Sequence, residues 1–258
     1  MAEPDTWAPL ADRFVDGYGT LRGRVRTYVI DAHLRAHLPP PPASLIDVGG
    51  GAGDQSIPLA ARGYEVTIAD PSQAMLDRAA ARLASGPAPT ASRVRLVRAG
   101  AENAAWALGG RRFDGVLCHG VIMYVDDPRP FTYALAGLAE SGGIVSLVAK
   151  NAACLAVQPA LQGRWADALT AFDAGRQVNG LGLDSRADTV DGLTALLAEA
   201  GVDQVTWYGV RLFTDGWTPP VADPPDSDDH ACLVELEASR RDPYRQLSRL
   251  FHLVGVRR

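Results

Sequence analysis

Three glycines and two carboxylates have the residue types and spacing of a nucleotide-binding loop. Gly49, Gly51 and Gly53 follow a short apolar run, and glycine allows a tight turn whose backbone N–H groups approach a ligand closely. Asp47 precedes this loop, and Asp70 ends the next apolar run, where its carboxylate can accept hydrogen bonds from both hydroxyls of a ribose. The pattern therefore predicts a site for a nucleotide-like ligand.

The spacing of the glycines argues against a dinucleotide. An NAD fingerprint needs G-x-G-x-x-G, but counting from Gly49 places Asp54 at the third glycine. Counting from Gly51 places Ser56 there. What remains, acidic-x-Gly-x-Gly-x-Gly with an acidic residue at the end of the second strand, resembles motifs I and II of class I S-adenosylmethionine-dependent methyltransferases. The resemblance implies that this loop holds the amino-acid part and ribose of S-adenosylmethionine, whereas the plain alternative is a glycine turn without a ligand.

Later segments resemble the same family. Ala99-Gly100-Ala101-Glu102 resembles the segment that frames adenine, with Glu102 near the exocyclic amine. The run Phe113–His119 resembles the fourth strand, whose end faces the sulfonium methyl group. Ser141–Ile144 resembles the glycine turn into the fifth strand. The resemblance at this level covers about residues 44–150 and is specific for the cofactor.

Short motifs spread over most of the chain carry a narrower resemblance. They are Tyr18-Gly19-Thr20, Arg26, Asp127-Pro128-Arg129, Asn151-Ala152, Gly209-Val210-Arg211 and Glu235-Leu236-Glu237, together with the glycine loop and His119. They resemble the bacterial tRNA 5-carboxymethoxyuridine methyltransferase family, whose members convert the carboxylate of a modified wobble uridine to its methyl ester. The resemblance implies cofactor contacts from Arg26, Gly49, Gly50, Asp70, Ala101, Glu102 and His119, to which the loop adds Asp47, Gly51 and Gly53.

Two arginines are candidates for binding carboxylates. Arg26 lies in a helical cluster with Arg22 and Arg24, and such a cluster is often simply solvated. The family resemblance instead makes Arg26 a bidentate clamp on the cofactor carboxylate. Arg211 has apolar neighbours, so it either pairs with a buried acid or binds a substrate carboxylate. We assign Arg211 to catalysis and substrate binding.

Five further residues are candidates for the site. His119 ends an apolar strand, and it either contacts the cofactor and orients the acceptor or, for an acceptor with a proton to lose, acts as the general base. A carboxylate acceptor needs no base because it is ionised at neutral pH. Tyr18 and Tyr124 are assigned to the substrate, with core packing as the alternative. Asn151 is also assigned to the substrate. Asp47 either bonds the cofactor amino group or braces the glycine turn.

Composition excludes several classes of protein. The 258 residues are 47% hydrophobic and 21% charged, which is typical of a globular protein, and no apolar run approaches the roughly 20 residues of a membrane helix. The net charge of −5 argues against a sequence-wide attraction to nucleic acid. Three scattered cysteines predict neither disulfides nor structural zinc, and no cluster of His, Asp and Glu predicts a metal site. The N-terminus does not resemble a secretion signal, so we expect a cytoplasmic location.

Alternating apolar and amphipathic segments predict an α/β fold. We expect a doubly wound Rossmann-like methyltransferase sheet, mostly parallel with an antiparallel last strand, and a helical lid insertion. The expected single domain, 1–258, has a helical cap at about 1–43, a cofactor-binding core at 44–150, a lid at 151–187 and a C-terminal part at 188–258. In that last part, Gln204–Phe213 and Ala231–Glu237 are predicted to pair as strands, and Pro243–Leu253 to form a closing helix.

The two resemblances thus imply an S-adenosylmethionine-dependent methyltransferase acting on the carboxylate of 5-carboxymethoxyuridine at the tRNA wobble position. Where that family carries a lysine-rich stretch, residues 173–184 of this chain contain no lysine. This loss and the acidic net charge favour an alternative, a small-molecule O- or N-methyltransferase whose lid closes over a metabolite. A third hypothesis is a non-catalytic S-adenosylmethionine-binding protein. We expect tRNA or a small molecule as the partner, and no membrane.

Overall fold

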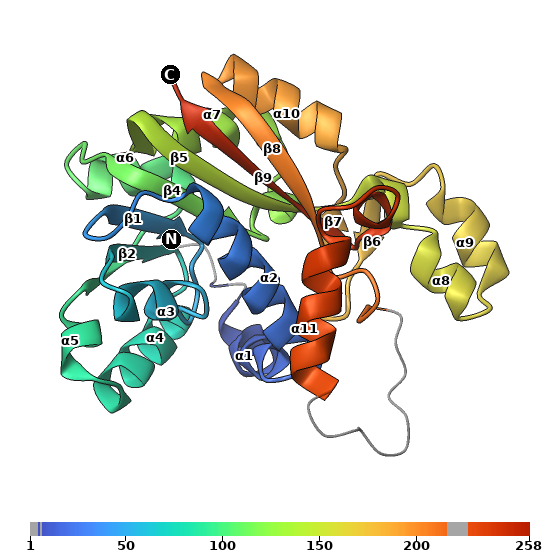
Figure 1. Ribbon diagram of the computed structural model, residues 1–258, viewed down its shortest axis with the longest axis horizontal. Coiled ribbons are helices and arrows are strands. Elements are labelled where there is room, and N and C mark those ends of the chain that lie inside the picture. Colours follow the sequence, from blue (N-terminus) through green and yellow to red (C-terminus); the bar gives the residue numbers. More distant parts are fainter. Residues whose placement is uncertain (1–4, 6, 216–226) are drawn as a thin grey trace.

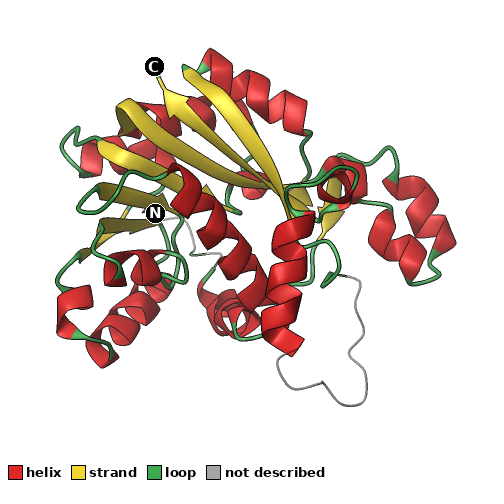
Figure 2. Ribbon diagram, in the orientation of Figure 1, coloured by secondary structure: helices red, strands yellow, loops and turns green. Residues whose placement is uncertain are grey.

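The computed structural model describes residues 5, 7–215 and 227–258 and is built around a seven-stranded sheet with helices on both faces (Figures 1 and 2). In spatial order the strands are β3 (Val94–Arg98), β2 (Glu65–Asp70), β1 (Ser44–Val48), β4 (Phe113–His119), β5 (Ala139–Lys150), β9 (Leu250–Arg257) and β8 (Val202–Val210). The first five run parallel, and β9 lies antiparallel between β5 and β8. The predicted mostly parallel sheet with an antiparallel last strand is confirmed.

The register of the parallel strands brings predicted site residues to one edge of the sheet. In β1, Asp47 lies opposite Ile68 of β2 and Leu117 of β4. These three strands therefore end close together, with Asp70 as the last residue of β2 and His119 as the last residue of β4. Ligands of such sheets bind beyond the carboxyl ends of the strands. The fold thus places the glycine loop, Asp70 and His119 around one site.

Two apolar clusters, one on each face of the sheet, hold the helices in place. The first face carries α2 (Leu21–His37), α3 (Ser56–Ala61), α4 (Gln73–Ser85) and α11 (Ser227–Ala238), and the second carries α6 (Ala101–Ala107), α7 (Pro128–Leu138) and α10 (Val190–Glu199). The short α5 (Ala88–Ala91) lies between α4 and β3 in the chain. Helix α2 lies within the region expected as a helical cap, at about residues 1–43. It begins where the Thr20 hydroxyl accepts a hydrogen bond from the Gly23 N–H and ends before a proline run.

Segments outside the sheet gather around its carboxyl edge. They are α1 (Ala11–Tyr18) before α2, and then, after β5, α8 (Val157–Leu161), α9 (Trp165–Ala171) and a hairpin of β6 (Arg176–Val178) and β7 (Asp184–Arg186). Figure 1 shows α8 and α9 projecting to the right of the sheet. The Arg13 guanidinium of α1 donates to the Gly180 carbonyl of the hairpin turn at 2.5 Å. This contact joins two segments far apart in the sequence.

Two expected elements of the C-terminal part are wrong. Ala231–Glu237, predicted as a strand, lies inside helix α11, and the antiparallel partner of β8 is β9. Pro243–Leu253, predicted as a closing helix, forms a short 3-10 turn over Tyr244–Leu247 followed by strand β9. Both runs are short and apolar, and periodicity alone does not separate a strand from a helix in such a run. No described helix is both long enough and apolar enough to cross a membrane.

Candidate functional site

The loop between β1 and α3 leaves no room for side chains. Gly49 and Gly51 have φ angles of +72° and +55°, in the region that favours glycine. A Cβ on Gly49 would lie 2.3 Å from a methyl group of Val121, and one on Gly50 would lie 2.8 Å from the Asp47 carboxylate. The backbone of residues 49–51 therefore forms one wall of a small pocket. Such a wall offers N–H groups to a ligand at close range.

Two carboxylates stabilise this loop in different ways. Asp70 accepts hydrogen bonds from the N–H groups of Gly51 and Ser72, both at 2.9 Å, and it lines the pocket. Burial raises the pKa of Asp70. Asp47 is buried behind the loop, where it accepts a hydrogen bond from the Ser56 hydroxyl at 2.7 Å, and burial raises its pKa to about 6. Of the two roles expected for Asp47, its position favours the brace for the turn.

Aromatic side chains from the N-terminal segment cover the pocket, whose volume is about 100 Å³. Trp7 packs edge-on against Phe14, with 5.6 Å between ring centroids, and against Tyr124, with 5.1 Å. Trp7 and Phe14 also pack against a small apolar cluster that contains Met75. Sequence reasoning missed Trp7 and Phe14, because isolated aromatic residues near a terminus carry no motif.

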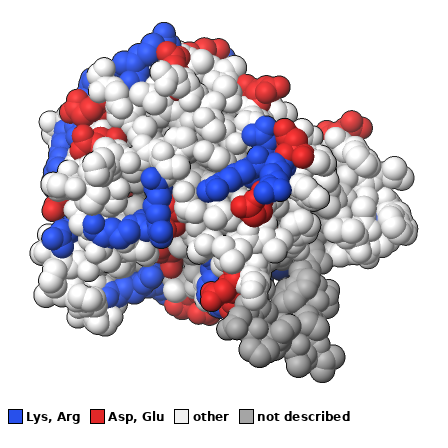
Figure 3. All heavy atoms as spheres, viewed as in Figure 1, with Lys and Arg blue, Asp and Glu red and all other residues white. Residues whose placement is uncertain are grey.

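The pocket opens into a cleft of about 1180 Å³. The two cavities share Phe14, Tyr18, His119, Gly120 and Tyr124 in their walls. The basic residues of the cleft wall are Arg13, Arg22, Arg26, Lys150, Arg164, Arg176, Arg211 and Arg249, whereas its acidic residues are Asp167 and Asp215. On the face shown in Figure 3, basic and acidic residues are interspersed. The cleft is thus a local concentration of positive charge in a chain of net charge −5.

Arg26 lies where the pocket meets the cleft. Its guanidinium donates to the Tyr18 hydroxyl at 2.8 Å and to the His119 carbonyl at 2.9 Å, and it lies over the Tyr18 ring. Arg26 is 9% exposed, so it is not part of a solvated helix face. The structure therefore brings together Arg26, Tyr18, His119 and Tyr124, and the roles assigned to these four residues stay predictions.

His119 is held in a neutral state. Its Nε2 atom is hydrogen-bonded to the Ser146 hydroxyl at 2.8 Å. Burial, with a smaller contribution from the nearby Arg26 cation, lowers the pKa of His119 to about 3. Its Nδ1 atom is buried and has no hydrogen-bond partner among the described residues. An imidazole in this state is a poor general base at neutral pH.

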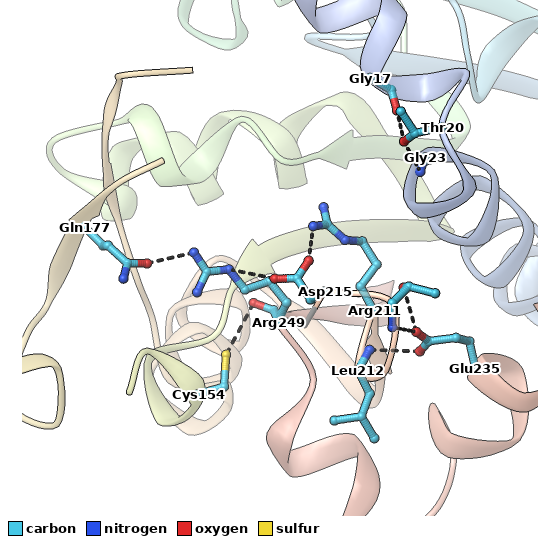
Figure 4. A network of polar contacts seen from close by, with 11 residues as sticks. Gly17, Thr20, Gly23, Cys154, Gln177, Arg211, Leu212, Asp215, Glu235 and Arg249 are labelled. Atoms are coloured by element: carbon cyan, nitrogen blue, oxygen red, sulfur yellow. Dashed lines mark hydrogen bonds and ion pairs between the residues drawn. The ribbon is translucent and has the colours of Figure 1, made fainter. Parts of the chain in front are cut away.

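Arg211 and Arg249 both line the cleft and lie on either side of the Asp215 carboxylate (Figure 4). Arg211 forms an ion pair with Asp215, and the other oxygen of Asp215 lies 3.5 Å from Nε of Arg249. Burial lowers the pKa of Arg211. Nε of Arg211 and one terminal nitrogen of Arg249 are buried without a partner in the described chain. Arg211 thus pairs with a buried acid and still has an N–H group for a second anion.

The loop that carries Arg211 is fixed by a carboxylate from α11. Glu235 accepts hydrogen bonds from the N–H groups of Leu212 and Thr214 and from the Thr214 hydroxyl, at 2.7 to 2.8 Å (Figure 4). Arg211 itself adopts a φ angle of +64°, which is uncommon for a residue with a side chain. The Glu235 contacts hold this strained turn, and they set the direction of the arginine.

Several predicted site residues lie elsewhere. Asn151 uses its whole side chain on the backbone, donating to the carbonyls of Gln246 and Ser248 and accepting from the Ala153 N–H, and it does not line the cleft. The polar atoms of the Asn151 side chain are thus paired with the backbone, and its assignment to the substrate stays a prediction. Gly53, Ala101 and Glu102 line neither cavity in the described chain, so their cofactor contacts stay predictions.

Sequence reasoning also missed two basic residues of the cleft. Arg249 directly precedes β9, and the expected closing helix hid its position. Lys150 ends β5 and donates to the Ser185 hydroxyl at 2.9 Å, while burial lowers its pKa to about 8. Lys150 is the one lysine of the chain, and this was the sequence signal that could have singled it out. Among the residues placed in the structure, no group of His, Cys, Asp and Glu could hold a metal ion, and the three cysteines are free and buried.

Comparisons with known proteins agree with this geometry. A family model described as a methyltransferase domain matches residues 46–145. The tRNA 5-carboxymethoxyuridine methyltransferase of Escherichia coli K12 is 29% identical over 243 residues, which cover 92% of this chain and 90% of that protein. A methyltransferase from Thermotoga maritima, titled a possible histamine N-methyltransferase, superposes with a TM-score of 0.62 at 14% identity, covering 98% of each chain. A glycopeptide N-methyltransferase solved with S-adenosylmethionine has a TM-score of 0.57 at 16% identity, covering 90% of this chain and 94% of that one.

Proposed function

Because the chain is a class I S-adenosylmethionine-dependent methyltransferase, we propose that it methylates the carboxylate of 5-carboxymethoxyuridine in tRNA. The observation that carries the proposal is the pair Arg211 and Arg249. Both have buried N–H groups without a partner in the described chain, and both line a basic cleft that joins the glycine-loop pocket. Two guanidinium groups in the same cleft wall can bind one carboxylate, because a carboxylate accepts charge-assisted hydrogen bonds from both.

The residues that line the glycine-loop pocket and its junction with the cleft suit S-adenosylmethionine. Side chains are excluded from residues 49–51, the Asp70 carboxylate lies in the wall, and the unpartnered His119 Nδ1 offers an acceptor. When bound, the cofactor supplies an electrophilic methyl group on a sulfonium. The residues of the chain hold and align the two reactants. The glycine loop and Asp70 bind the cofactor, and the arginine pair holds the acceptor carboxylate. The Trp7 and Phe14 rings cover the pocket and exclude water.

A carboxylate acceptor also agrees with the state of His119. An acceptor that must lose a proton needs a base, but the Nε2 atom of His119 is engaged by Ser146, and burial lowers its pKa to about 3. A carboxylate is already ionised at neutral pH and needs none. The imidazole is then left to orient and bind, which is the first of the two roles expected for it.

The tRNA part of the proposal is supported by the relative from Escherichia coli, whose similarity spans 92% of this chain and so extends beyond the cofactor-binding region. The cleft adds a physical reason. Phosphate contacts supply much of the affinity for nucleic acid, and arginines from both ends of the chain, such as Arg13 and Arg22 with Arg249, line this cleft.

The test is transfer of labelled methyl groups to tRNA that carries 5-carboxymethoxyuridine, compared with a small-molecule extract. We expect label in tRNA that mild alkali releases as from an ester. Arg211→Gln should lower kcat/KM for tRNA by about 10- to 100-fold while the cofactor Kd stays unchanged. Arg24→Gln is the matched control, since Arg24 is half-exposed and pairs with Asp228 on the surface. Unchanged turnover of Arg211→Gln would exclude Arg211 from acceptor binding.

One alternative acceptor is favoured by a specific observation. The hairpin of β6 and β7 closes over the cleft, because Arg13 donates to the Gly180 carbonyl and Asn179 donates to the Tyr124 hydroxyl at 2.7 Å. A covered cleft suits a small molecule with a carboxylate. Label that appears only in the small-molecule fraction would assign this function in place of tRNA methylation.

A further inference from the structure

We propose that four buried side chains, Ser146, His252, His33 and Ser239, fix His119 as the neutral tautomer that carries its proton on Nε2. We call this set the histidine relay. It makes the Nδ1 atom of His119 a permanent hydrogen-bond acceptor toward the ligand, never a donor. The relay residues are positioning residues, because within the described chain none of the four lines the pocket or the cleft.

The relay is a continuous chain of hydrogen bonds. His119 Nε2 lies 2.8 Å from Ser146 Oγ, which lies 2.7 Å from His252 Nε2. The Nδ1 atoms of His252 and His33 are 3.1 Å apart, and His33 Nε2 lies 2.9 Å from Ser239 Oγ. All four relay side chains are at most 1% exposed. Water therefore does not compete for these contacts.

The far end of the relay sets the direction of every bond. Ser239 Oγ lies 2.6 Å from the Leu236 carbonyl oxygen, and a carbonyl only accepts, so the Ser239 hydroxyl must donate to it. Ser239 can then only accept from His33, which places the His33 proton on Nε2. The Nδ1 of a neutral His33 is therefore an acceptor, and His252 must donate to it from its own Nδ1.

The bond directions continue from His252 to His119. With its proton on Nδ1, a neutral His252 accepts at Nε2 from the Ser146 hydroxyl. That hydroxyl has one proton, so it accepts from His119, whose proton must be on Nε2. The remaining atom, His119 Nδ1, carries a lone pair, is buried and has no partner in the described chain. One carbonyl on α11 thus determines which atom of His119 accepts at the pocket.

Burial keeps each histidine of the relay neutral, which these bond directions require. Desolvation lowers the pKa of His33 to about 3, with smaller contributions from Arg240 and His37. Desolvation, with the neighbouring histidines, also lowers the pKa of His252 well below its usual range. A neutral acceptor at the junction of pocket and cleft suits a positively charged ligand group, because it offers a lone pair without adding positive charge.

The first test reads the tautomer directly. Nitrogen NMR of the full-length protein with labelled histidine, without cofactor at pH 7, distinguishes protonated from bare ring nitrogens. We expect His119 to be protonated on Nε2 and bare on Nδ1, and His252 to show the opposite pattern. A cationic His119, or one protonated on Nδ1, would overturn the proposal. This measurement needs no variant and does not depend on the identity of the acceptor.

The second test breaks the relay far from the ligand. Ser239→Ala removes the acceptor of His33, so the bond directions are no longer fixed, and we expect the His119 signals to show both tautomers. The cofactor Kd should rise by about three- to ten-fold, the worth of one hydrogen bond. Ser239→Thr restores a hydroxyl and should restore the single tautomer. A single Nε2–H tautomer in Ser239→Ala would show that the relay does not control His119.

The matched control is Thr132→Ala on α7, on the other face of the sheet. Thr132 is also fully buried, and its hydroxyl also donates to a carbonyl three residues earlier, that of Arg129, at 2.8 Å. We expect a similar loss of thermal stability in both variants but a change of the His119 tautomer only in Ser239→Ala. An equal rise in cofactor Kd in both would make the effect general destabilisation and overturn the proposal.

Discussion

Replacing Asp47 with asparagine should stabilise the protein at neutral pH, because an ionised carboxylate is unfavourable at this buried position. Asp47 is 3% exposed, and burial raises its pKa from 3.8 to about 6. Folding therefore takes up a proton between about pH 4 and 6, so stability falls as the pH rises through this range. The ionised group costs about 3 kcal/mol at pH 7.5 and about 1 kcal/mol at pH 4.5.

The Asp47→Asn variant removes this charge but keeps an oxygen that can accept the Ser56 hydroxyl. We expect urea unfolding without cofactor to give a free energy of unfolding up to about 3 kcal/mol above wild type at pH 7.5, and about 1 kcal/mol above it at pH 4.5. Asp114→Asn is a control of opposite sign, because hydrogen bonds from the Ser44 N–H and hydroxyl lower the pKa of Asp114.

Two results would refute this argument. A variant no more stable than wild type at pH 7.5 would mean that the buried charge is compensated. An equal gain at both pH values would mean that the effect is not electrostatic. The same variant distinguishes the two roles of Asp47. If Asp47 only braces the loop, Asp47→Asn should leave the cofactor Kd within about three-fold of the wild-type value. If Asp47 bonds directly to the cofactor ammonium, the loss of that bond would raise the Kd by about ten-fold or more.

Three further predictions concern the pocket and the cleft. Gly50→Ala places a Cβ 2.8 Å from the buried Asp47 carboxylate, so we expect the cofactor Kd measured by calorimetry to rise at least about ten-fold. Gly175→Ala is the control, because open space surrounds the new Cβ, and it should leave the cofactor Kd unchanged. Arg249→Gln should lower kcat/KM for the carboxylate acceptor without changing the cofactor Kd, and an unchanged kcat/KM would remove Arg249 from the acceptor site. Affinity for tRNA should fall steeply between low and physiological salt, and a flat response would favour a small acceptor.

The cofactor half of the site was predictable because its signal is local. The glycine loop, the acid before it and Asp70 are encoded within one strand–loop–helix–strand unit, and each requirement acts on a residue and its near neighbours. A turn with positive φ needs glycine, and a parallel sheet buried on both faces needs apolar strands. The parallel direction of the strands up to β5 follows from the same pattern.

The C-terminal part was not predictable in the same way. The runs that became α11 and β9 are both short and apolar, and their conformation depends on what packs against them. The run Leu250–Arg257 is a strand because its backbone pairs with β5 on one side and with β8 on the other. The error at β9 also hid Arg249, which gains its role only when that strand brings it beside Asp215.

The sequence alone therefore determined the class of fold, the cofactor loop and the presence of candidate arginines, because these depend on short-range patterns. The tertiary structure decided which groups meet. It pairs Arg211 and Arg249 around Asp215, and it joins His33 to His252 across 219 positions of the chain. No local pattern records such contacts, because the sheet order and the packing of α2 and α11 create them only when the chain has folded.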